Sequence, residues 1–258
     1  MLYAPAMRLA LLLLLLAPAA HATEPTQLRY AVYAGGLNVV VLHSEMRLSP
    51  RAYQVRLLYR TAGLYSLIVG ADLETTVSGR FVAGRAVPYR FYSAGRLRGI
   101  AREVLIDYVN GIPLVRRLIP PLGPKREPVP PAEETGTVDT LSAMAQMAEQ
   151  VNETQRCDGA MRVFDGRRLI ALSAKTIGLQ VLPPSNVSTF SGEALRCDVV
   201  SQQLAGFKHD QDEARLRRPQ RGDAWFGRLV PGGPLVLVRA TFPTIFFGHG
   251  TMYLQSRE

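Results

Sequence analysis

The chain of 258 residues is 47% hydrophobic and carries 30 basic against 21 acidic side chains, a formal net charge of +9. This apolar content can fill a core, and the length suits one large all-β domain or two small ones. All but three of the basic residues are arginines, spread without a block of like charges, which argues against a basic arm that binds nucleic acid. The positive balance favours an anionic partner such as lipid headgroups or lipopolysaccharide, unless it only reflects the codon usage of a GC-rich genome.

The N-terminus is typical of a secretory signal peptide. Arg8 precedes an apolar run from Leu9 to Ala17, and Ala20-His21-Ala22 places small residues where a signal peptidase reads them. The run is short for a membrane span, although an uncleaved N-terminal anchor is the alternative. We expect residues 1–22 to be removed after Ala22, leaving residues 23–258 as a single periplasmic domain that is not an integral membrane protein.

Residues 28–119 have the pattern of an antiparallel meander. Apolar and polar residues alternate over Tyr53–Thr61 and again over Ile100–Tyr108, as expected of strands with one wet face. Turn signals such as Gly35-Gly36 and Asn110-Gly111 separate the segments. Leu64–Val69 is apolar throughout and fits either a strand or a short helix.

Six prolines between Pro120 and Pro131 end this pattern. Proline lacks the N–H donor that a β-ladder needs and stiffens the chain. We therefore predict an exposed linker over residues 120–136, with a proline-rich docking peptide as the alternative.

A helix is predicted over about residues 138–151. Thr137 or Asp139 can cap it. Its apolar positions follow helical spacing along one face, and they are Leu141, Met144, Met147, Ala148 and Val151. We expect the helix to lie across the sheet or close one end of it, with the two methionines serving as core filler.

Cys157 and Cys197 are the only cysteines. In an oxidising compartment an even count favours a disulfide, and the pair lacks the Cys-x-x-Cys spacing of redox sites; buried free thiols are the alternative. The closed loop would contribute about 4 kcal/mol by chain entropy. Between the cysteines, Asp165-Gly166 predicts a hairpin joining Ala160–Phe164 to Arg168–Leu172.

Further strand patterns follow to the C-terminus. They cover residues 176–182, 193–204, 235–242 and 244–254. The predicted fold is therefore all-β, mainly an antiparallel meander in a curved sheet or partly open barrel, with one or two helices. Alternation with a period of two does not distinguish a sheet curled around a cavity from a packed sandwich.

We find no motif for catalysis, metal or cofactor binding, and predict no catalytic residue, metal ligand or cofactor. The mature chain holds His43, His209 and His249, far apart and without paired metal-ligand spacing. We expect His43 on the apolar face of its strand as a core histidine, and His209 in a solvated, charged run. A nucleophile elbow and a phosphate-binding loop are both missing from the sequence.

Several short segments, by their order and spacing together, resemble a bacterial family of exported proteins known as domain of unknown function 3108. The segments begin at Tyr30 (Tyr-Ala-Val-Tyr-Ala-Gly-Gly-Leu), Thr61 (Thr-Ala-Gly-Leu), Val87 (Val-Pro-Tyr), Val138 (Val-Asp-Thr-Leu-Ser), Val163 (Val-Phe-Asp-Gly-Arg-Arg), Arg196 (Arg-Cys-Asp-Val), Leu204 (Leu-Ala-Gly-Phe-Lys), Trp225 (Trp-Phe) and Pro234 (Pro-Leu-Val). Thr140 stands where the family commonly has proline. The resemblance implies a periplasmic, β-rich protein and carries over no catalytic residue; a looser likeness links it to periplasmic lipoprotein carriers.

Three functional hypotheses remain open. The first is a non-catalytic envelope protein that binds a lipid, a lipoprotein or another amphiphile in a curved sheet; its ligand-binding residues are unknown from the sequence. The second is an envelope scaffold that docks another protein through a sheet edge or the 120–136 segment. The third is a hydrolase of an envelope polymer, which requires a cleft that joins one of the histidines to a carboxylate or hydroxyl.

Overall fold

The computed structural model describes residues 24–244 and 248–257, so the predicted signal peptide lies outside the described residues. Within them, thirteen strands form one antiparallel sheet. The strands of its first run are β1 (Thr26–Ala34), β2 (Leu37–Leu48), β3 (Ala52–Thr61), β4 (Ala71–Val82), β5 (Arg85–Leu97), β6 (Ile100–Val109) and β7 (Ile112–Ile119). Those of the second run are β8 (Gly159–Phe164), β9 (Leu169–Leu182), β10 (Gly192–Ala205), β11 (Gln220–Arg228), β12 (Leu235–Pro243) and β13 (His249–Arg257).

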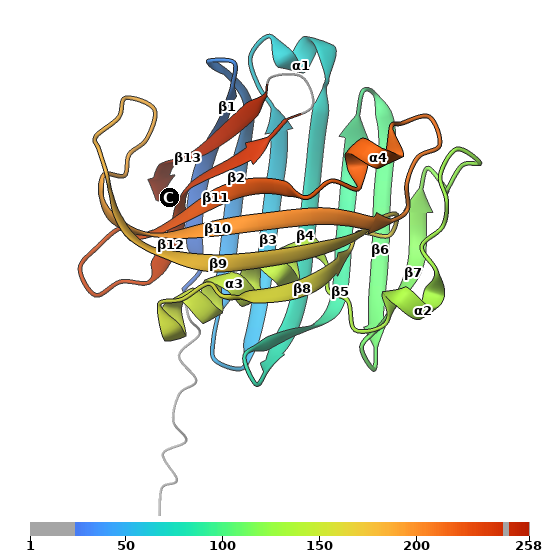
Figure 1. Ribbon diagram of the computed structural model, residues 1–258, viewed down its shortest axis with the longest axis horizontal. Helices are drawn as coiled ribbons and strands as arrows, with labels where there is room; N and C mark the ends of the chain where they lie inside the picture. Colours follow the sequence, from blue (N-terminus) through green and yellow to red (C-terminus); the bar gives the residue numbers. More distant parts are fainter. Residues whose placement is uncertain (1–23, 245–247, 258) are drawn as a thin grey trace, which may run out of the picture.

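The two runs are meanders joined by the pairing of β1 with β13. The sheet curls so that the strands of the second run cross in front of the upright strands of the first (Figure 1). The predicted fold class, an all-β curved sheet with few helices, is confirmed. The helices are α1 (Tyr65–Ile68), α2 (Pro131–Glu134), α3 (Thr140–Thr154) and α4 (Glu213–Leu216), and α1 settles the ambiguous Leu64–Val69 segment as a short helix.

Local irregularities allow the sheet to bend. Register shifts occur in β1 between Val32 and Tyr33 and in β11 between Trp225 and Phe226, and bulges of this kind bend a strand and increase its twist. Gly79 also permits close packing, because a Cβ there would lie 2.3 Å from the hydroxyl oxygen of Tyr53. The sheet can therefore fold back on itself without separate domains.

The predicted hairpin at Asp165-Gly166 joins β8 to β9 and closes the curled sheet. Its loop spans four residues, because Phe164 pairs with Leu169, and the Asp165 carboxylate accepts hydrogen bonds from two backbone N–H groups within it. A Cβ at Gly166 would lie 3.0 Å from a methyl of Val104 on β6. The tip of the second run thus packs on the far strands of the first.

The proline-rich segment, predicted as a linker, is attached to the rest of the protein in its middle. Most of it is exposed, but Val129 is buried, and the Glu127 carboxylate accepts hydrogen bonds of 3.1 Å from the backbone N–H groups of Gly206 and Phe207. The prediction of an exposed linker is therefore wrong for its middle, because Val129 is buried and the Glu127 carboxylate holds the segment to the residues that follow β10.

Candidate functional site

A cavity of about 970 Å³ lies between the two runs of the sheet. Inward-facing residues of β1, β2 and β3 form one wall, and residues of β9, β11 and β12 form the other. The β1 residues Leu28, Tyr30 and Val32 illustrate the pattern, since alternate side chains of a strand point to one face. This part of the sheet interior is therefore hollow, whereas a buried cluster around Tyr53, Ile106 and Leu169 fills another part.

The lining is dominated by apolar groups. Tyr30 is buried, which raises the pKa of its phenol, and its hydroxyl donates a 2.9 Å hydrogen bond to the carbonyl of Leu237 on β12. Arg221 and Asp223 border the cavity but form ion pairs with Asp198 and Arg196. Burial raises the pKa of Glu149, a further lining residue, and the nearby Glu153 adds to the rise.

Helix α3 covers one end of the cavity and bridges the two runs. Near its N-terminal half, the Gln146 side chain accepts a 2.8 Å hydrogen bond from the backbone N–H of Ala86 on β5. Near its C-terminus, the Asn152 amide bonds to both the N–H and the carbonyl of Leu235 on β12, at 2.7 and 2.9 Å. The helix begins at Thr140, two residues later than predicted, and ends three residues later at Thr154.

The two methionines of the helix lie between the packed core and the cavity. Met144 and Met147 line the cavity together with Ala148 and are only partly buried. Both methionines pack against buried core clusters, as predicted, but the face of α3 that carries them borders the cavity as well. Flexible, polarisable methionines suit a surface that adapts to its occupant.

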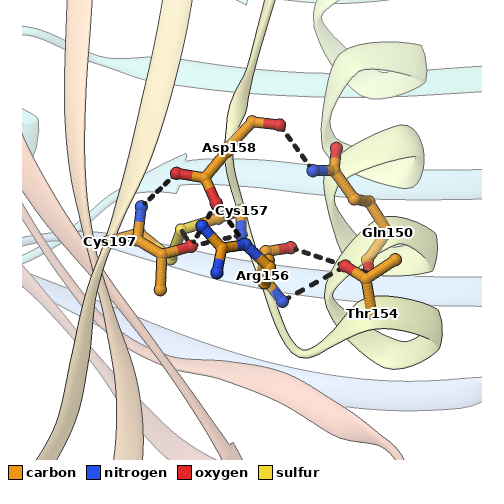
Figure 2. A network of polar contacts seen from close by, with 7 residues as sticks. Gln150, Thr154, Arg156, Cys157, Asp158 and Cys197 are labelled. Atoms are coloured by element: carbon orange, nitrogen blue, oxygen red, sulfur yellow. Dashed lines mark hydrogen bonds and ion pairs between the residues drawn. A yellow bond between two sulfur atoms is a disulfide. The ribbon is translucent and has the colours of Figure 1, made fainter.

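Cys157 and Cys197 form a disulfide with their Cα atoms 6.3 Å apart. It fastens the chain directly after α3 to β10 (Figure 2). Asp158 reinforces the link: its carboxylate accepts hydrogen bonds from the backbone N–H and hydroxyl of Thr176 on β9, and its carbonyl accepts one from the Gln150 side chain at 2.7 Å. The pKa of Asp158 is lowered, chiefly by the hydrogen bond from the backbone N–H of Thr176. Helix α3, which we call the plug helix because it covers one end of the cavity, is thus held by a covalent bond and by hydrogen bonds.

The N-terminus of α3 rests on a buried polar cluster. Asp139 caps the helix by accepting from the backbone N–H of Ser142 at 2.9 Å and from its hydroxyl at 2.6 Å. The hydroxyl of Tyr53 on β3 donates to Ser142 Oγ at 2.7 Å. Burial raises the pKa of Asp139 to about 6, although the hydrogen bonds from Ser142 oppose the rise. The cluster fixes the helix against the first run.

The three histidines are not brought together at the cavity. His43 lies on β2 between Leu42 and Ser44, which line the cavity, so it belongs to the opposite face of the strand. The expectation of a core position for His43 is wrong, because the extra residue Val39 at the register shift leaves the even-numbered residues of β2 after it facing inward. His209 and His249 are exposed on other segments. Across residues 24–244 and 248–257, no group of three or more His, Cys, Asp or Glu side chains is placed to hold a metal ion.

The fold and the cavity define a class: a β-barrel-like protein in which a curled sheet and a plug helix enclose an apolar space. The chain belongs to the family described as protein of unknown function (DUF3108), whose model matches residues 29–255. This match confirms the resemblance found in the sequence. Comparison with curated proteins returned no match.

Two solved structures are similar over most of the chain. One is a β-barrel-like protein of domain of unknown function DUF1849 from Brucella abortus, with 14% identity, a TM-score of 0.49 and coverage of 90% of this chain and 96% of that one. The other is a protein from Parabacteroides distasonis provisionally assigned as a lipoprotein, with 10% identity, a TM-score of 0.40 and coverage of 92% and 96%. Among the helices of the described residues, none has the length and apolar character of a membrane span.

Proposed function

We propose that this protein is a non-catalytic, periplasmic lipid-binding protein of the cell envelope, which holds the apolar part of a lipid or lipidated protein in the cavity. The observation that carries the proposal is the apolar cavity of about 970 Å³ between the two runs of the sheet. This volume is at the upper end of the roughly 300–1,000 Å³ found for small-molecule sites. An acyl chain that leaves water for such a space gains about 0.8 kcal/mol for each buried CH₂ group.

The construction of the plug supports a site that persists without its ligand. Helix α3 is held by Gln146 at one run, by Asn152 at the other and by the adjacent disulfide. A preformed site loses less conformational entropy when the ligand binds. The disulfide also suits an exported protein, because such bonds persist in oxidising compartments such as the periplasm.

We expect Ala148→Phe to fill part of the cavity and weaken ligand binding. Ala148 lines the space on α3, and a phenyl ring there would compete with an acyl chain for the same volume. The affinity for N-phenyl-1-naphthylamine, an apolar dye displaced by palmitate, should fall by about tenfold or more. Dye titration of the mature protein measures this directly.

The matched control is Ala132→Phe, which adds the same ring at an exposed position of α2, away from the cavity lining. It should bind the dye as the wild type does. Wild-type protein that binds neither dye nor palmitate, or equal weakening by both variants, would refute the proposed cavity site.

A further inference from the structure

Three loops gather at the end of the cavity opposite α3. They are the β1–β2 turn, the α1 segment between β3 and β4, and the β5–β6 turn. The backbone N–H of Ala62 donates to the carbonyl of Val39, and that of Arg98 donates to the carbonyl of Gly70, so the loops are neighbours. Helix α3 contacts the other end of these strands, where Ala86 follows the β4–β5 turn. Figure 1 shows α1 at the top of the view and α3 in its lower half.

These loops carry exposed apolar side chains, which we call the apolar rim. On the α1 segment, Leu64, Leu67 and Ile68 are 72%, 83% and 75% exposed, and the adjoining turns add Leu37 and Ile100, both 53% exposed. Exposed apolar side chains that cluster in this way mark interaction sites on proteins or membranes. The apolar rim is therefore a candidate interaction surface.

The rim is continuous with the cavity. Tyr65, next to Leu64 in the chain, lines the cavity and packs on the core beside β1 and β2. The α1 segment is also fixed in place, because the Thr61 hydroxyl accepts a 2.9 Å hydrogen bond from the backbone N–H of Ala71 across its base. Its leucines are thus displayed by an anchored loop at the edge of the ligand space.

The charges around the rim are mainly positive. Arg60, Arg96 and Arg98 surround it and are exposed, while Asp72, which pairs with Arg60 at 3.1 Å, is the one acidic residue on the adjoining strand ends and loops named here. Exposed apolar side chains bordered by arginines complement a bilayer with anionic headgroups, since the apolar groups enter the interface and the guanidinium groups meet phosphates.

We propose that the apolar rim docks this protein on an anionic phospholipid bilayer, with the cavity opening toward the membrane. Docking would add the membrane as a partner for the proposed lipid-binding protein. It rests on that proposed function in one respect: its purpose would be the passage of an acyl chain between bilayer and cavity. Vesicle binding itself requires no ligand in the cavity, so a failure here leaves the dye-binding test standing.

Vesicle co-sedimentation of the mature protein tests the docking. Wild-type protein should pellet with vesicles of phosphatidylcholine and phosphatidylglycerol. The variant Leu64→Ser/Leu67→Ser/Ile68→Ser should lose about tenfold or more in partition coefficient. Arg98→Asn suits the left-handed backbone at φ 53°, and it should weaken binding about fivefold at low salt, because one arginine near an anionic surface contributes that much.

The control variant carries the same three serines at Ile177, Leu179 and Val181, which are exposed on β9 in the other run. It should bind as the wild type does. Wild-type protein that stays in the supernatant, a rim variant that pellets equally well, or equal losses for rim and control variants would each overturn the docking proposal. Undiminished dye binding by the rim variant would show that its cavity is intact.

Discussion

Asp139 is a fully buried carboxyl group with a structural role at the start of α3. Its pKa of about 6 means that the folded protein binds a proton that the unfolded chain, with an ordinary value of 3.8, has released. The group therefore contributes most to the free energy of unfolding below pH 3.8, and this contribution is lost as the pH rises through 6. Tyr53 and Ser142 connect the titration to the first run of the sheet.

We expect the free energy of unfolding to fall by about 2 kcal/mol between pH 4 and 7 because of this group. Asp139→Asn keeps an N-cap residue but cannot titrate, so its stability should lack this fall. Urea unfolding at several pH values, followed by the fluorescence of the single tryptophan, Trp225, measures the difference. The account of Asp139 fails if Asp139→Asn retains the wild-type pH dependence. The control is Asp212→Asn at the exposed N-cap of α4, which should retain that dependence.

For single residues, the sequence predicted which parts of the chain pair with each other better than it predicted which way side chains point. The disulfide and the hairpin at Asp165-Gly166 were accessible because each depends on a local or countable signal. His43 was misplaced and the cavity beside Met144 and Met147 was missed, because the orientation of a side chain depends on the bulge at Val39 and on what faces the helix. Neither feature has a signal in the spacing of apolar residues.

Among the elements, α3 differs from the others because its attachments come from both runs. Gln146 bonds to Ala86 on β5 of the first run, whereas Asn152 bonds to Leu235 on β12 and the Cys157–Cys197 disulfide fastens the following residues to β10 of the second. The apolar stripe predicted the helix and an end-covering position for it. The stripe did not predict that part of this face borders a cavity, since a stripe packed on a sheet has the same spacing.

Replacing both cysteines by serine should lower the free energy of unfolding by about 4 kcal/mol, because the unfolded chain regains the freedom of a loop of about forty residues. Denaturant unfolding of the variant, and of wild-type protein with and without dithiothreitol, provides the measurement. Reduction should leave the unfolding of the cysteine-free variant unchanged. An unchanged midpoint for reduced wild-type protein would mean that the bond does not stabilise the fold.

The proline-rich segment shows a second limit of prediction at the element scale. Prolines correctly mark the end of the first meander, since they cannot continue a ladder. The anchorage of Glu127 to the backbone of Gly206 and Phe207 joins parts of the chain far apart in sequence, and local composition contains no sign of it. A segment attached in this way offers less free length as a docking peptide than the sequence indicated.

For the whole molecule, the all-β meander was predictable, whereas the hollow interior was not. Alternation fixes which residues can face inward on each strand, but the space between the two runs depends on the bulges, the closing hairpin and the helix that spans them. The resulting molecule has a cavity between an anchored plug at one end and an apolar, arginine-bordered rim at the other. Under the proposed function, an amphiphile would enter and leave the cavity through the rim end.

The most direct test of the central claim is native mass spectrometry of mature protein purified gently from its own periplasm, followed by solvent extraction and lipid analysis. We predict a reproducible additional mass that extracts as lipid, which Ala148→Phe reduces and Ala132→Phe retains. A bare protein mass, unchanged after incubation with an extract of envelope lipids, would contradict the proposal that the cavity holds a lipid.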